Sequence, residues 1–433
     1  MEIDRQVALG ILEPVKFSPW ATPVVPVLKR DGSIRLCGDH KVTVNWETVT
    51  ETYPLPRVED LLSSLAGGKA FSKLDAYQQV VLDDEAKEMV TIHTHKGLYK
   101  VNRLPFGVAS APSLFQRIME NILQGLPGVS VYIDDILVTG KTIEEHLSNL
   151  KAVLTRLEES GIKLKQNKCS FLLPSVEYLG HHISADGVQP TPEKVEAVQK
   201  APAPKDVSQI KSFLGVVNYY SKFLSDLSST LAPLYTLLQK DTKWSWGTAQ
   251  QKAFVEVKKL LRSDRLLVHF DPTKELILAC DASPYGVGAV LSYRGPNGEE
   301  KPIAFASRSL GTAEKNYSHL EKEGLAIVFG VKKFHQFLFG RHFTILSDHK
   351  PLQHLFKETS SIPPLASARI QRWALLLGRG GRYQVFSVRY DTEYFTFDTV
   401  NTIRFSIPIL NKSEASIQDK HVDNIHIHTH TDR

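Results

Sequence analysis

Two apolar, β-branched runs flank a pair of adjacent aspartates, and this pattern constrains the fold more than any other in the chain. Val129 to Ile133 precedes Asp134 and Asp135, and Ile136 to Val138 follows them. Because the apolar flanks favour burial, we expect a β-hairpin that carries the acidic pair at its exposed tip. An ordinary acidic turn would give the same local pattern, so the interpretation depends on the residues that accompany it.

Length and composition limit the classes of protein that fit. The 433 residues are too many for one ordinary hydrophobic core and predict two or three domains. No run of about 18 apolar residues occurs, so a membrane-spanning helix is not expected. The three cysteines are far apart and form no Cys-x-x-Cys pair, which argues against a disulfide framework or a zinc knuckle. The formal charge of +5 allows a nucleic-acid partner without requiring one.

The N-terminal residues give an expectation about compartment. They lack the basic start and the apolar stretch of a secretory signal. Together with the cysteine usage, this predicts an intracellular chain that is not secreted, in the cytoplasm or the nucleus. No basic cluster stands out among the scattered Lys and Arg residues as a nuclear signal.

Hydrophobic periodicity divides the chain into a mixed first part, a helical middle and a second strand-rich block. In the first part we expect strands at 22–28, 33–37 and 70–75 and helices near 57–65, 110–123 and 142–160. In the middle, Asp206 is a candidate helix cap, and residues 226–270 read as mostly helical. The second block predicts strands at 276–280, 287–293, 302–307 and 343–346, one long helix near 313–338, and a short helix after Pro351.

A third carboxylate accompanies the acidic pair in the first part. Asp75 closes the apolar strand that begins at Phe71. In-line phosphoryl transfer by two divalent ions needs several carboxylates at one point, because Mg²⁺ prefers oxygen ligands. An aspartate from a neighbouring strand beside the hairpin of Asp134 and Asp135 would complete such a group.

The second block carries three further acids. Asp281 ends its first strand, Glu323 lies on its long helix, and Asp348 ends the strand after that helix. Taken singly, each acid reads as an ordinary exposed side chain. In a β-β-β-α-β order, however, these positions indicate an acidic cluster on a sheet backed by a helix, the arrangement of RNase H.

Motifs in both parts resemble the reverse transcriptase and RNase H of gypsy-type long-terminal-repeat retrotransposons. The resemblance runs from about residue 2 to residue 377. The motifs that carry it are Arg35-Leu36-Cys37-Gly38-Asp39, Tyr53-Pro54-Leu55-Pro56, Leu104-Pro105-Phe106-Gly107, Tyr132-Ile133-Asp134-Asp135, Tyr178-Leu179-Gly180-His181, Ser212-Phe213-Leu214-Gly215 and Ala368-Arg369-Ile370-Gln371-Arg372-Trp373.

The resemblance implies an α+β fold: a right-hand polymerase with fingers, palm and thumb, followed by a connection and a truncated RNase H-like α/β domain. It divides the chain into fingers and palm at 1–184, thumb and connection at 185–272, and an incomplete RNase H-like domain at 273–377. Residues 378–433 would be a divergent, poorly ordered tail.

The resemblance also implies roles for individual residues. The carboxylates that would act in catalysis and bind Mg²⁺, or Mn²⁺ in its place, are Asp75, Asp134, Asp135, Asp281, Glu323 and Asp348. Lys29 and Arg35 would meet the incoming triphosphate, and Tyr77 would check its sugar. Gln116 would lie near the template–primer, and Leu179-Gly180 would form the primer-gripping turn.

The implied partners are an RNA template, a DNA primer, RNA–DNA hybrid and dNTPs, with no membrane. The protease and integrase of an intact element find no match in this chain. It is therefore not expected to complete a transposition cycle alone.

The chain departs from the family pattern at two places. Leu74-Asp75-Ala76-Tyr77-Gln78-Gln79 stands where the family reads Leu-Asp-Leu-x-x-Ala-Tyr-x-Gln, so three residues are missing directly after Asp75. From Gly378 onward the family's last strand, last helix and fourth carboxylate motif are not recognisable. Asp391 and Asp398 are the nearest acids there, and neither stands in such a motif.

Three hypotheses follow from these features. The first is an RNA-directed DNA polymerase with an RNase H domain, acting by two-metal phosphoryl transfer. The second is a catalytically impaired remnant that keeps the fold and binds nucleic acid through phosphate contacts. The third is a host protein that uses the fold as an interaction scaffold. The retained carboxylates favour the first, and the two departures favour the second.

Overall fold

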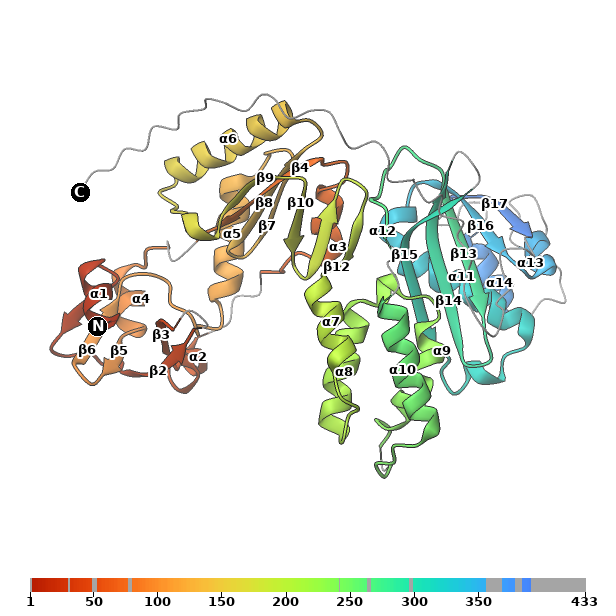
Figure 1. Cartoon of the computed structure of the whole chain (residues 1–433), viewed down its shortest axis with the longest axis horizontal. Coiled ribbons are helices and arrows are strands. Elements are labelled where there is room, and N and C mark those ends of the chain that lie inside the picture. Colours follow the sequence, from red (N-terminus) through yellow and green to blue (C-terminus); the bar gives the residue numbers. More distant parts are fainter. Residues whose placement is uncertain are drawn as a thin grey trace.

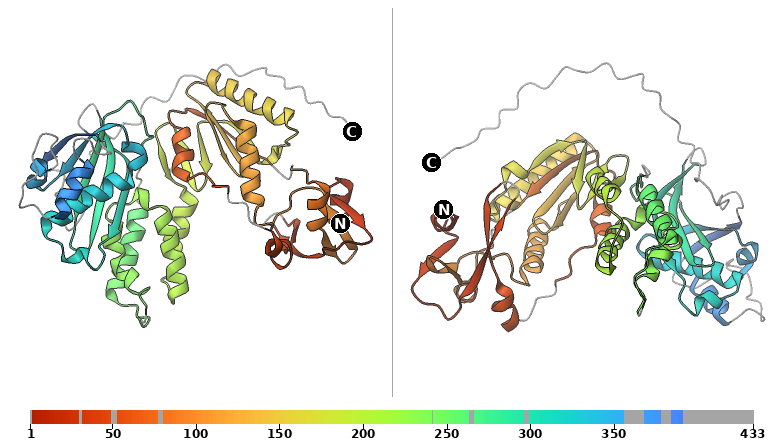
Figure 2. Two further views of the ribbon diagram at one scale, coloured as in Figure 1. Left: turned by 180° about the vertical axis from the view of Figure 1, so that it is seen from behind. Right: turned by 60° about the horizontal axis from the view of Figure 1, so that its bottom comes forward.

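The computed structural model describes residues 2–29, 32–48, 53–76, 80–240, 242–262, 266–295, 299–355, 368–377 and 384–390. Its units follow one another along an arc, which Figure 1 shows from the N-terminal unit at the left to the last sheet at the right. Figure 2 shows the same arrangement from behind. Within these described ranges, no helix combines the length and the apolar character needed to cross a membrane.

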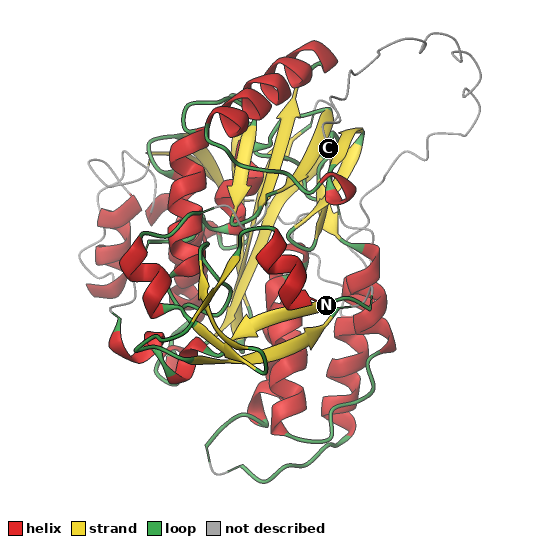
Figure 3. Ribbon diagram, turned by 90° about the vertical axis from the view of Figure 1, so that its left-hand side faces the viewer, coloured by secondary structure: helices red, strands yellow, loops and turns green. Residues whose placement is uncertain are grey.

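The N-terminal unit, which we call the fingers, is built on a five-stranded sheet in the order β1-β6-β5-β2-β3. Figure 3 views the molecule from this end. Its helices are α1 (Glu2–Ala8), α2 (Val44–Glu47) and α4 (Asp84–Met89), and its strands are β1 (Leu12–Val15), β2 (Thr22–Leu28), β3 (Ile34–Gly38), β5 (Ile92–Thr94) and β6 (Gly97–Val101). The expected hairpin of β2 and β3 is present, with the Lys29 N–H donating to the Ser33 carbonyl at 2.8 Å.

The palm is a four-stranded sheet in the order β7-β8-β4-β9. Its elements are α3 (Val58–Ser64), β4 (Ala70–Asp75), α5 (Ala111–Leu123), β7 (Val129–Tyr132), β8 (Asp135–Gly140), α6 (Ile143–Glu159) and β9 (Ser170–Leu173). The apolar faces of α5 and α6 pack on the sheet through Met119 and Val153, which are fully buried against Leu74. This packing holds the two strands that carry the aspartates.

Three short strands and four helices follow the palm, and we call them the thumb and connection. They are β10 (Ser175–Tyr178), β11 (His181–Ser184), β12 (Val188–Pro190), α7 (Pro192–Lys200), α8 (Val207–Tyr219), α9 (Leu227–Thr236) and α10 (Thr248–Arg262). Asp206 caps α8 as predicted, because its carboxylate accepts the Gln209 N–H at 2.8 Å.

The last unit, which we call the RNase H-like unit, has a five-stranded sheet in the order β15-β14-β13-β16-β17. Its elements are β13 (Leu276–Ala282), β14 (Gly286–Arg294), β15 (Glu300–Ser309), α11 (His319–Lys333), α12 (His335–Leu338), β16 (His342–Ser347), α13 (Lys350–Leu355), α14 (Ala368–Leu377) and β17 (Gln384–Tyr390). β13 pairs antiparallel with β14 and parallel with β16. α11 covers one face of β13 and β14 through Ala326 and Val331.

One apolar cluster connects the palm, the thumb and the RNase H-like unit. It contains Leu61 of α3, Ile210 of α8, Leu231 of α9 and Phe305 of β15. Through these contacts the RNase H-like unit packs against the thumb.

The structure differs from the expectation of one long helix at 313–338. Residues Glu314–Asn316 form a separate short 3₁₀ turn, and α11 begins only after Ser318. Ser318 sets the start of α11 as its N-cap, because its hydroxyl accepts the Glu321 N–H while the Glu321 carboxylate accepts the Ser318 N–H. A second break at Phe334 separates α11 from α12.

The structure also differs beyond residue 377, where no further strand is expected from the sequence. Gln384–Tyr390 forms β17, which pairs in parallel with β16 at the edge of the sheet. The expected loss of the last strand was therefore wrong. The run Val385-Phe386-Ser387-Val388 has β-forming residues, but its partner lies about 40 residues earlier in the chain, outside any local pattern. The rest of the expected tail, 378–383 and 391–433, lies outside the described residues.

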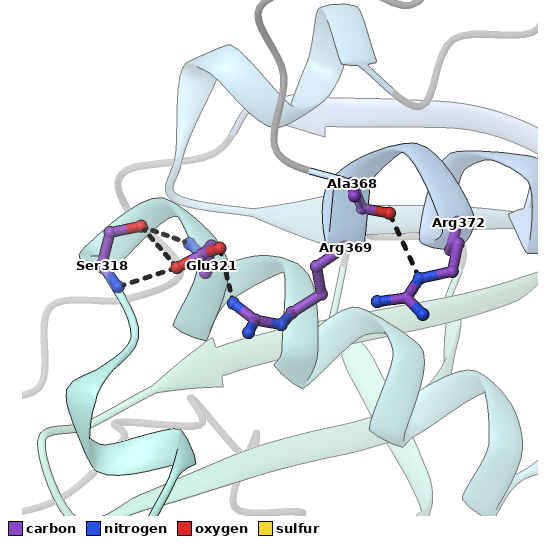
Figure 4. A network of polar contacts seen from close by, with 5 residues as sticks. All are labelled: Ser318, Glu321, Ala368, Arg369 and Arg372. Carbon is purple, nitrogen blue, oxygen red and sulfur yellow. Dashed lines mark hydrogen bonds and ion pairs between the residues drawn. The ribbon is translucent and has the colours of Figure 1, made fainter.

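A polar network ties α14 to the start of α11, the helix that carries Glu323. Arg369 donates to the Glu321 carboxylate at 2.6 Å, and Figure 4 shows Glu321 between Ser318 and Arg369. The Arg369 guanidinium also lies over the Tyr317 ring, 3.8 Å from its centroid. Glu321 therefore serves both the cap of α11 and the contact with α14.

We expect Glu321→Ala to lower the free energy of unfolding by about 1–2 kcal/mol, since it removes a capping partner and an ion pair together. Ser318→Ala should lower it by about 1 kcal/mol, since it removes the cap alone. Arg372→Ala is the control, because among the described residues Arg372 donates to its own helix, at the Ala368 carbonyl, 3.2 Å away. Urea unfolding measures all three, and equal effects for Glu321→Ala and Arg372→Ala would contradict this role for Glu321.

Candidate active sites

The Asp134–Asp135 pair lies at the hairpin that the sequence predicts. Tyr132 pairs with Asp135, so the two-residue turn between β7 and β8 consists of Ile133 and Asp134. Asp134 is exposed, and Asp135 is half-buried at the start of β8. Ile133 has a φ of 54°, a left-handed conformation that β-branched residues rarely adopt. Such strain persists only where the surrounding structure enforces it, and it is common at functional sites.

Gln116 of α5 holds this turn in place. Its Nε2 donates to the Val131 carbonyl at 3.0 Å, and its Oε1 accepts the Ile133 N–H at 2.5 Å. The side chain has no exposed surface. Gln116 is therefore a positioning residue for the acidic turn, and its expected place near the template–primer stays a prediction.

β4 brings Asp75 to the same end of the palm sheet. Asp75 pairs with Asp135, and the Ala76 N–H donates to the Asp134 carbonyl at 2.8 Å. The three aspartates predicted from sequence thus lie together, on two neighbouring strands and the turn between β7 and β8.

Two lysines lie against these carboxylates. Lys168 Nζ is 2.7 Å from Asp75 Oδ2, and Lys73 Nζ is 3.2 Å from Asp135 Oδ1. Partial desolvation and the charges of Asp135 and Asp75 raise the pKa of Asp134. Further positive charge at this point would relieve the repulsion, and the all-oxygen donor set fits Mg²⁺.

A cavity of about 820 Å³ lies between the fingers and the palm. Its lining combines metal-binding and phosphate-binding side chains: Asp75, Asp134, Lys165 and Lys168 from the palm, and Lys29, Arg35 and Phe106 from the fingers side. The Arg35 guanidinium lies over the Phe106 ring, 4.8 Å from its centroid. The cavity therefore unites Lys29 and Arg35 with two of the three predicted aspartates.

The predicted sugar-checking residue, Tyr77, lies outside the described residues. The palm is described up to Ala76, and the chain is described again from Val80, whose carbonyl accepts the Leu104 N–H at 2.9 Å. Ala76 and Val80 both line the cavity. The last described residue before this gap and the first one after it therefore both lie at the cavity wall.

The turn of Leu179 and Gly180 joins β10 to β11, with φ values of 48° and 72°. The Tyr219 hydroxyl donates to the Leu179 carbonyl at 2.6 Å, and the Tyr220 hydroxyl donates to the Gly180 carbonyl at 2.9 Å. Both tyrosines lie at the end of α8, so the thumb holds this turn by two consecutive carbonyls. The turn does not line the cavity, and its role at the primer stays a prediction.

We expect Gly180→Ala to lower the free energy of unfolding by about 1–2 kcal/mol, because the alanine must adopt a left-handed conformation. Its Cβ would also lie 3.0 Å from the Tyr220 hydroxyl oxygen. Gly161→Ala is the matched control, since Gly161 has a φ of 68° and nothing within 4 Å of an added Cβ. Equal losses for the two variants in urea unfolding would show that the contact with Tyr220 contributes nothing.

Asp281, Glu323 and Asp348 meet at one edge of the RNase H-like sheet. Asp281 lies near the end of β13, and Asp348 directly follows β16. Because these strands are parallel, their carboxyl ends share one edge, where α11 also places Glu323. One carboxylate oxygen from each residue belongs to a group whose members all lie within 4.8 Å of one another.

The buried oxygens of this group are consistent with a metal site. Glu323 is 1% exposed, and among the described residues neither its Oε2 nor Asp348 Oδ1 has a hydrogen-bond partner. Burial and the charges of Asp281 and Asp348 raise the pKa of Glu323 to about 9. Burial, with the charges of Asp348 and Asp226, raises the pKa of Asp281 to about 6. A divalent cation would satisfy these oxygens and offset their repulsion.

Two family models match the chain in the regions that carry these sites. Residues 27–183 match the reverse transcriptase (RNA-dependent DNA polymerase) family, and residues 271–379 match the RNase H-like domain found in reverse transcriptase. The chain is also 35% identical over 372 residues to the Retrovirus-related Pol polyprotein from transposon 297 of Drosophila melanogaster. It belongs to the reverse transcriptase and RNase H region of gypsy-type retrotransposon Pol polyproteins.

The retrotransposon relatives are much longer than this reverse transcriptase chain. The match to transposon 297 covers 84% of the chain and 34% of the relative. The Retrovirus-related Pol polyprotein from transposon 412 of Drosophila melanogaster is 32% identical, and the match covers 86% of this chain and 31% of that relative. The Transposon Tf2-3 polyprotein of Schizosaccharomyces pombe is 34% identical, and the match covers 87% of this chain and 28% of that relative. The chain thus spans about a third of the length of these curated relatives.

Solved reverse transcriptases share the fold of this chain. The foamy viral protease-reverse transcriptase dRH in complex with ds DNA has a TM-score of 0.78 and 26% identity, covering 90% of this chain and 68% of that one. The foamy viral enzyme in complex with RNA/DNA hybrid has a TM-score of 0.70 and 24% identity, covering 98% and 55%, which shows the fold alone. These matches confirm the reverse transcriptase fold followed by an RNase H-like domain.

Two histidines beside the RNase H carboxylates were missed by the sequence reasoning. His319 Nε2 lies 4.0 Å from Glu323 Oε1, and the rings of His319 and His349 have centroids 5.3 Å apart. The i, i+4 spacing of His319 and Glu323 on one helix is the signal that would have found the first of them.

Proposed function

We propose that this reverse transcriptase chain is an RNA-directed DNA polymerase that also cleaves the RNA of RNA–DNA hybrids. The cavity between fingers and palm supports the polymerase part, because it combines acids that suit a metal with cations that suit a triphosphate. The template would be RNA, the primer DNA, and the substrates dNTPs.

In the cavity, the acidic residues would bind the metal and the basic residues would bind the triphosphate. Asp75 and Asp134 would hold Mg²⁺, or Mn²⁺ in its place, with Asp135 beside them. When bound, the metal would activate the primer 3′-hydroxyl and stabilise the leaving pyrophosphate. Arg35 can bind two phosphate oxygens at once, whereas Lys29 supplies a point charge. Lys168 would hold Asp75 in position through their ion pair.

Extension of a DNA primer on an RNA template, with dNTPs and Mg²⁺, tests the polymerase part. The wild-type chain should extend the primer, and Asp75→Asn should not. Arg35→Ala should raise the KM for dNTPs more than it lowers kcat, because Arg35 would bind the nucleotide. Failure of the wild-type chain to extend would overturn this part of the proposal.

The group of Asp281, Glu323 and Asp348 supports the ribonuclease part. Carboxylates that converge within 4.8 Å suit divalent ions that activate water against an RNA phosphodiester. With a labelled RNA–DNA hybrid and Mg²⁺, the wild-type chain should cleave the RNA and Asp281→Asn should not. No cleavage by either would end the ribonuclease part and leave the polymerase part standing.

The competing proposal is an impaired remnant that binds nucleic acid without extending it. The shortened connection after Asp75 favours it, because a misplacement of about 1 Å can reduce a rate on the order of a hundredfold. Such a chain would bind a template–primer duplex with an affinity that falls as salt rises, and would give no product.

A further inference from the structure

A fourth carboxylate, Asp226, lies beside the RNase H group and comes from the connection. We propose that Asp226 is the fourth acid of the RNase H centre and helps to hold a second divalent ion next to Asp281. This inference rests on the proposed ribonuclease function. Asp226 would take the place of the acid in the family's fourth carboxylate motif, which has no recognisable counterpart after residue 377.

Asp281 and Asp226 lie on the same face of the RNase H-like sheet. Along β14, Ala289 packs into the cluster with α11, whereas Val290 packs against the thumb cluster on the opposite face. Side chains alternate along a strand, so Gly288 lies on the face of Val290. Gly288 pairs with Asp281, and paired residues share a face. Asp281 therefore lies on the strand face that the connection covers, although at the strand end its carboxylate still reaches the Glu323 carboxylate of α11.

The first turn of α9 seats the connection on this face. The Ser228 N–H donates to Ser307 Oγ at 3.0 Å, and Ser229 Oγ lies 3.3 Å from the Oγ of Ser283, two residues beyond Asp281. Figures 1 and 2 both show α9 beside the sheet of the RNase H-like unit. These contacts fix Asp226, the residue that precedes α9, close to the end of β13.

The Asp226 carboxylate is directed at the sheet. Asp226 occupies the N-cap position of α9, yet within the described structure its side chain makes no capping hydrogen bond. Its Oδ1 lies 3.7 Å from the point where a Cβ on Gly288 would stand, and the Asp281 carbonyl oxygen lies 3.9 Å from the same point. Its φ of 47° and ψ of 25° are left-handed, a region that Asp tolerates better than most residues.

One observation within the group points to a cation. The buried Glu323 Oε2 lacks a hydrogen-bond partner within the described structure, and a cation bound in the group would satisfy it. Asp226 is not one of the three residues that converge within 4.8 Å. It would therefore serve a neighbouring ion, with Asp281 between the two positions, as a two-metal mechanism requires.

Manganese binding by the full chain tests the proposal without relying on activity. The titration uses a parent with Asp75→Asn and Asp134→Asn, so that binding by the polymerase aspartates is removed. We expect the parent to bind two Mn²⁺ ions at the RNase H group. Asp226→Asn should weaken the second ion by about 10–100-fold and leave the first unchanged, whereas Asp281→Asn should weaken both.

Asp186→Asn, in an exposed bend between β11 and β12, is the matched control and should bind like the parent. Thermal unfolding in EDTA checks that each variant is folded. In chains that retain the polymerase aspartates, saturating Mn²⁺ should restore hybrid cleavage to Asp226→Asn but not to Asp281→Asn. Parent-like binding by Asp226→Asn would overturn the proposal while the ribonuclease function stands. A parent that binds no ion at this group would overturn both.

Discussion

Asp134→Asn is expected to reduce primer extension by at least about 100-fold while the chain stays folded. Asn has nearly the same size as Asp, and the turn backbone remains held by Gln116 through the Ile133 N–H. The substitution removes the one carboxylate that is both exposed at the turn and part of the cavity lining. Single-turnover extension on an RNA template measures the effect, with far-UV circular dichroism to confirm folding.

Asp135→Asn is the matched control for this prediction. Its carboxylate is paired with Lys73 and does not line the cavity. We therefore expect a smaller loss, about tenfold, from the changed charge next to the metal position. A larger loss for Asp135→Asn than for Asp134→Asn would contradict the assignment of Asp134 as the metal ligand.

Glu323→Gln is expected to act in opposite directions on stability and on activity. In EDTA at pH 9 the variant should be more stable than the wild-type chain by about 1 kcal/mol, because it removes a buried charge from the side of two other acids. Stabilisation by added Mg²⁺ should be lost, and cleavage of an RNA–DNA hybrid should fall by at least about 100-fold. Thermal unfolding and gel analysis of a labelled hybrid measure the two effects.

The stability difference should also depend on pH in the metal-free chain. The pKa of Glu323 rises from 4.5 to about 9 on folding. Between these pH values the folded chain keeps a proton that the unfolded chain has lost, so stability must fall as pH rises through this window. Glu323→Gln removes that dependence, and its advantage in EDTA should therefore grow from pH 5 to pH 9. Parallel stability curves for the two chains would contradict the raised pKa.

Most members of both acidic groups could be predicted from the sequence because they mark the ends of local elements, whereas Glu323 lies within a helix. Asp75 and Asp281 close apolar strands, and Asp134 lies between two β-branched runs. Pairing of β4 with β8, and of β13 with β16, then brings strand ends together without further information. Spacing and strand order indicated these positions, and the resemblance supplied their roles.

Other features depend on tertiary packing and left no local sign. Gln116 reads as a polar residue on an amphipathic helix, and only the packing of α5 on the hairpin shows that it is buried. β17 becomes a strand because the edge of β16 offers it a partner. Asp226 lies beside Asp281 only because α9 docks on the RNase H-like sheet. In each case the partner is distant in sequence, so periodicity could not indicate it.

Primer extension by the wild-type chain, compared with a version that has three residues inserted after Asp75, tests the proposed polymerase most directly. The assay uses an RNA template, a DNA primer, dNTPs and Mg²⁺, with Asp134→Asn as the blank. We predict extension by both proteins, because Ala76 and Val80 on either side of the shortened segment both line the cavity with Asp75 and Asp134. Extension by the inserted version alone would contradict the proposal and identify the wild-type chain as an impaired remnant.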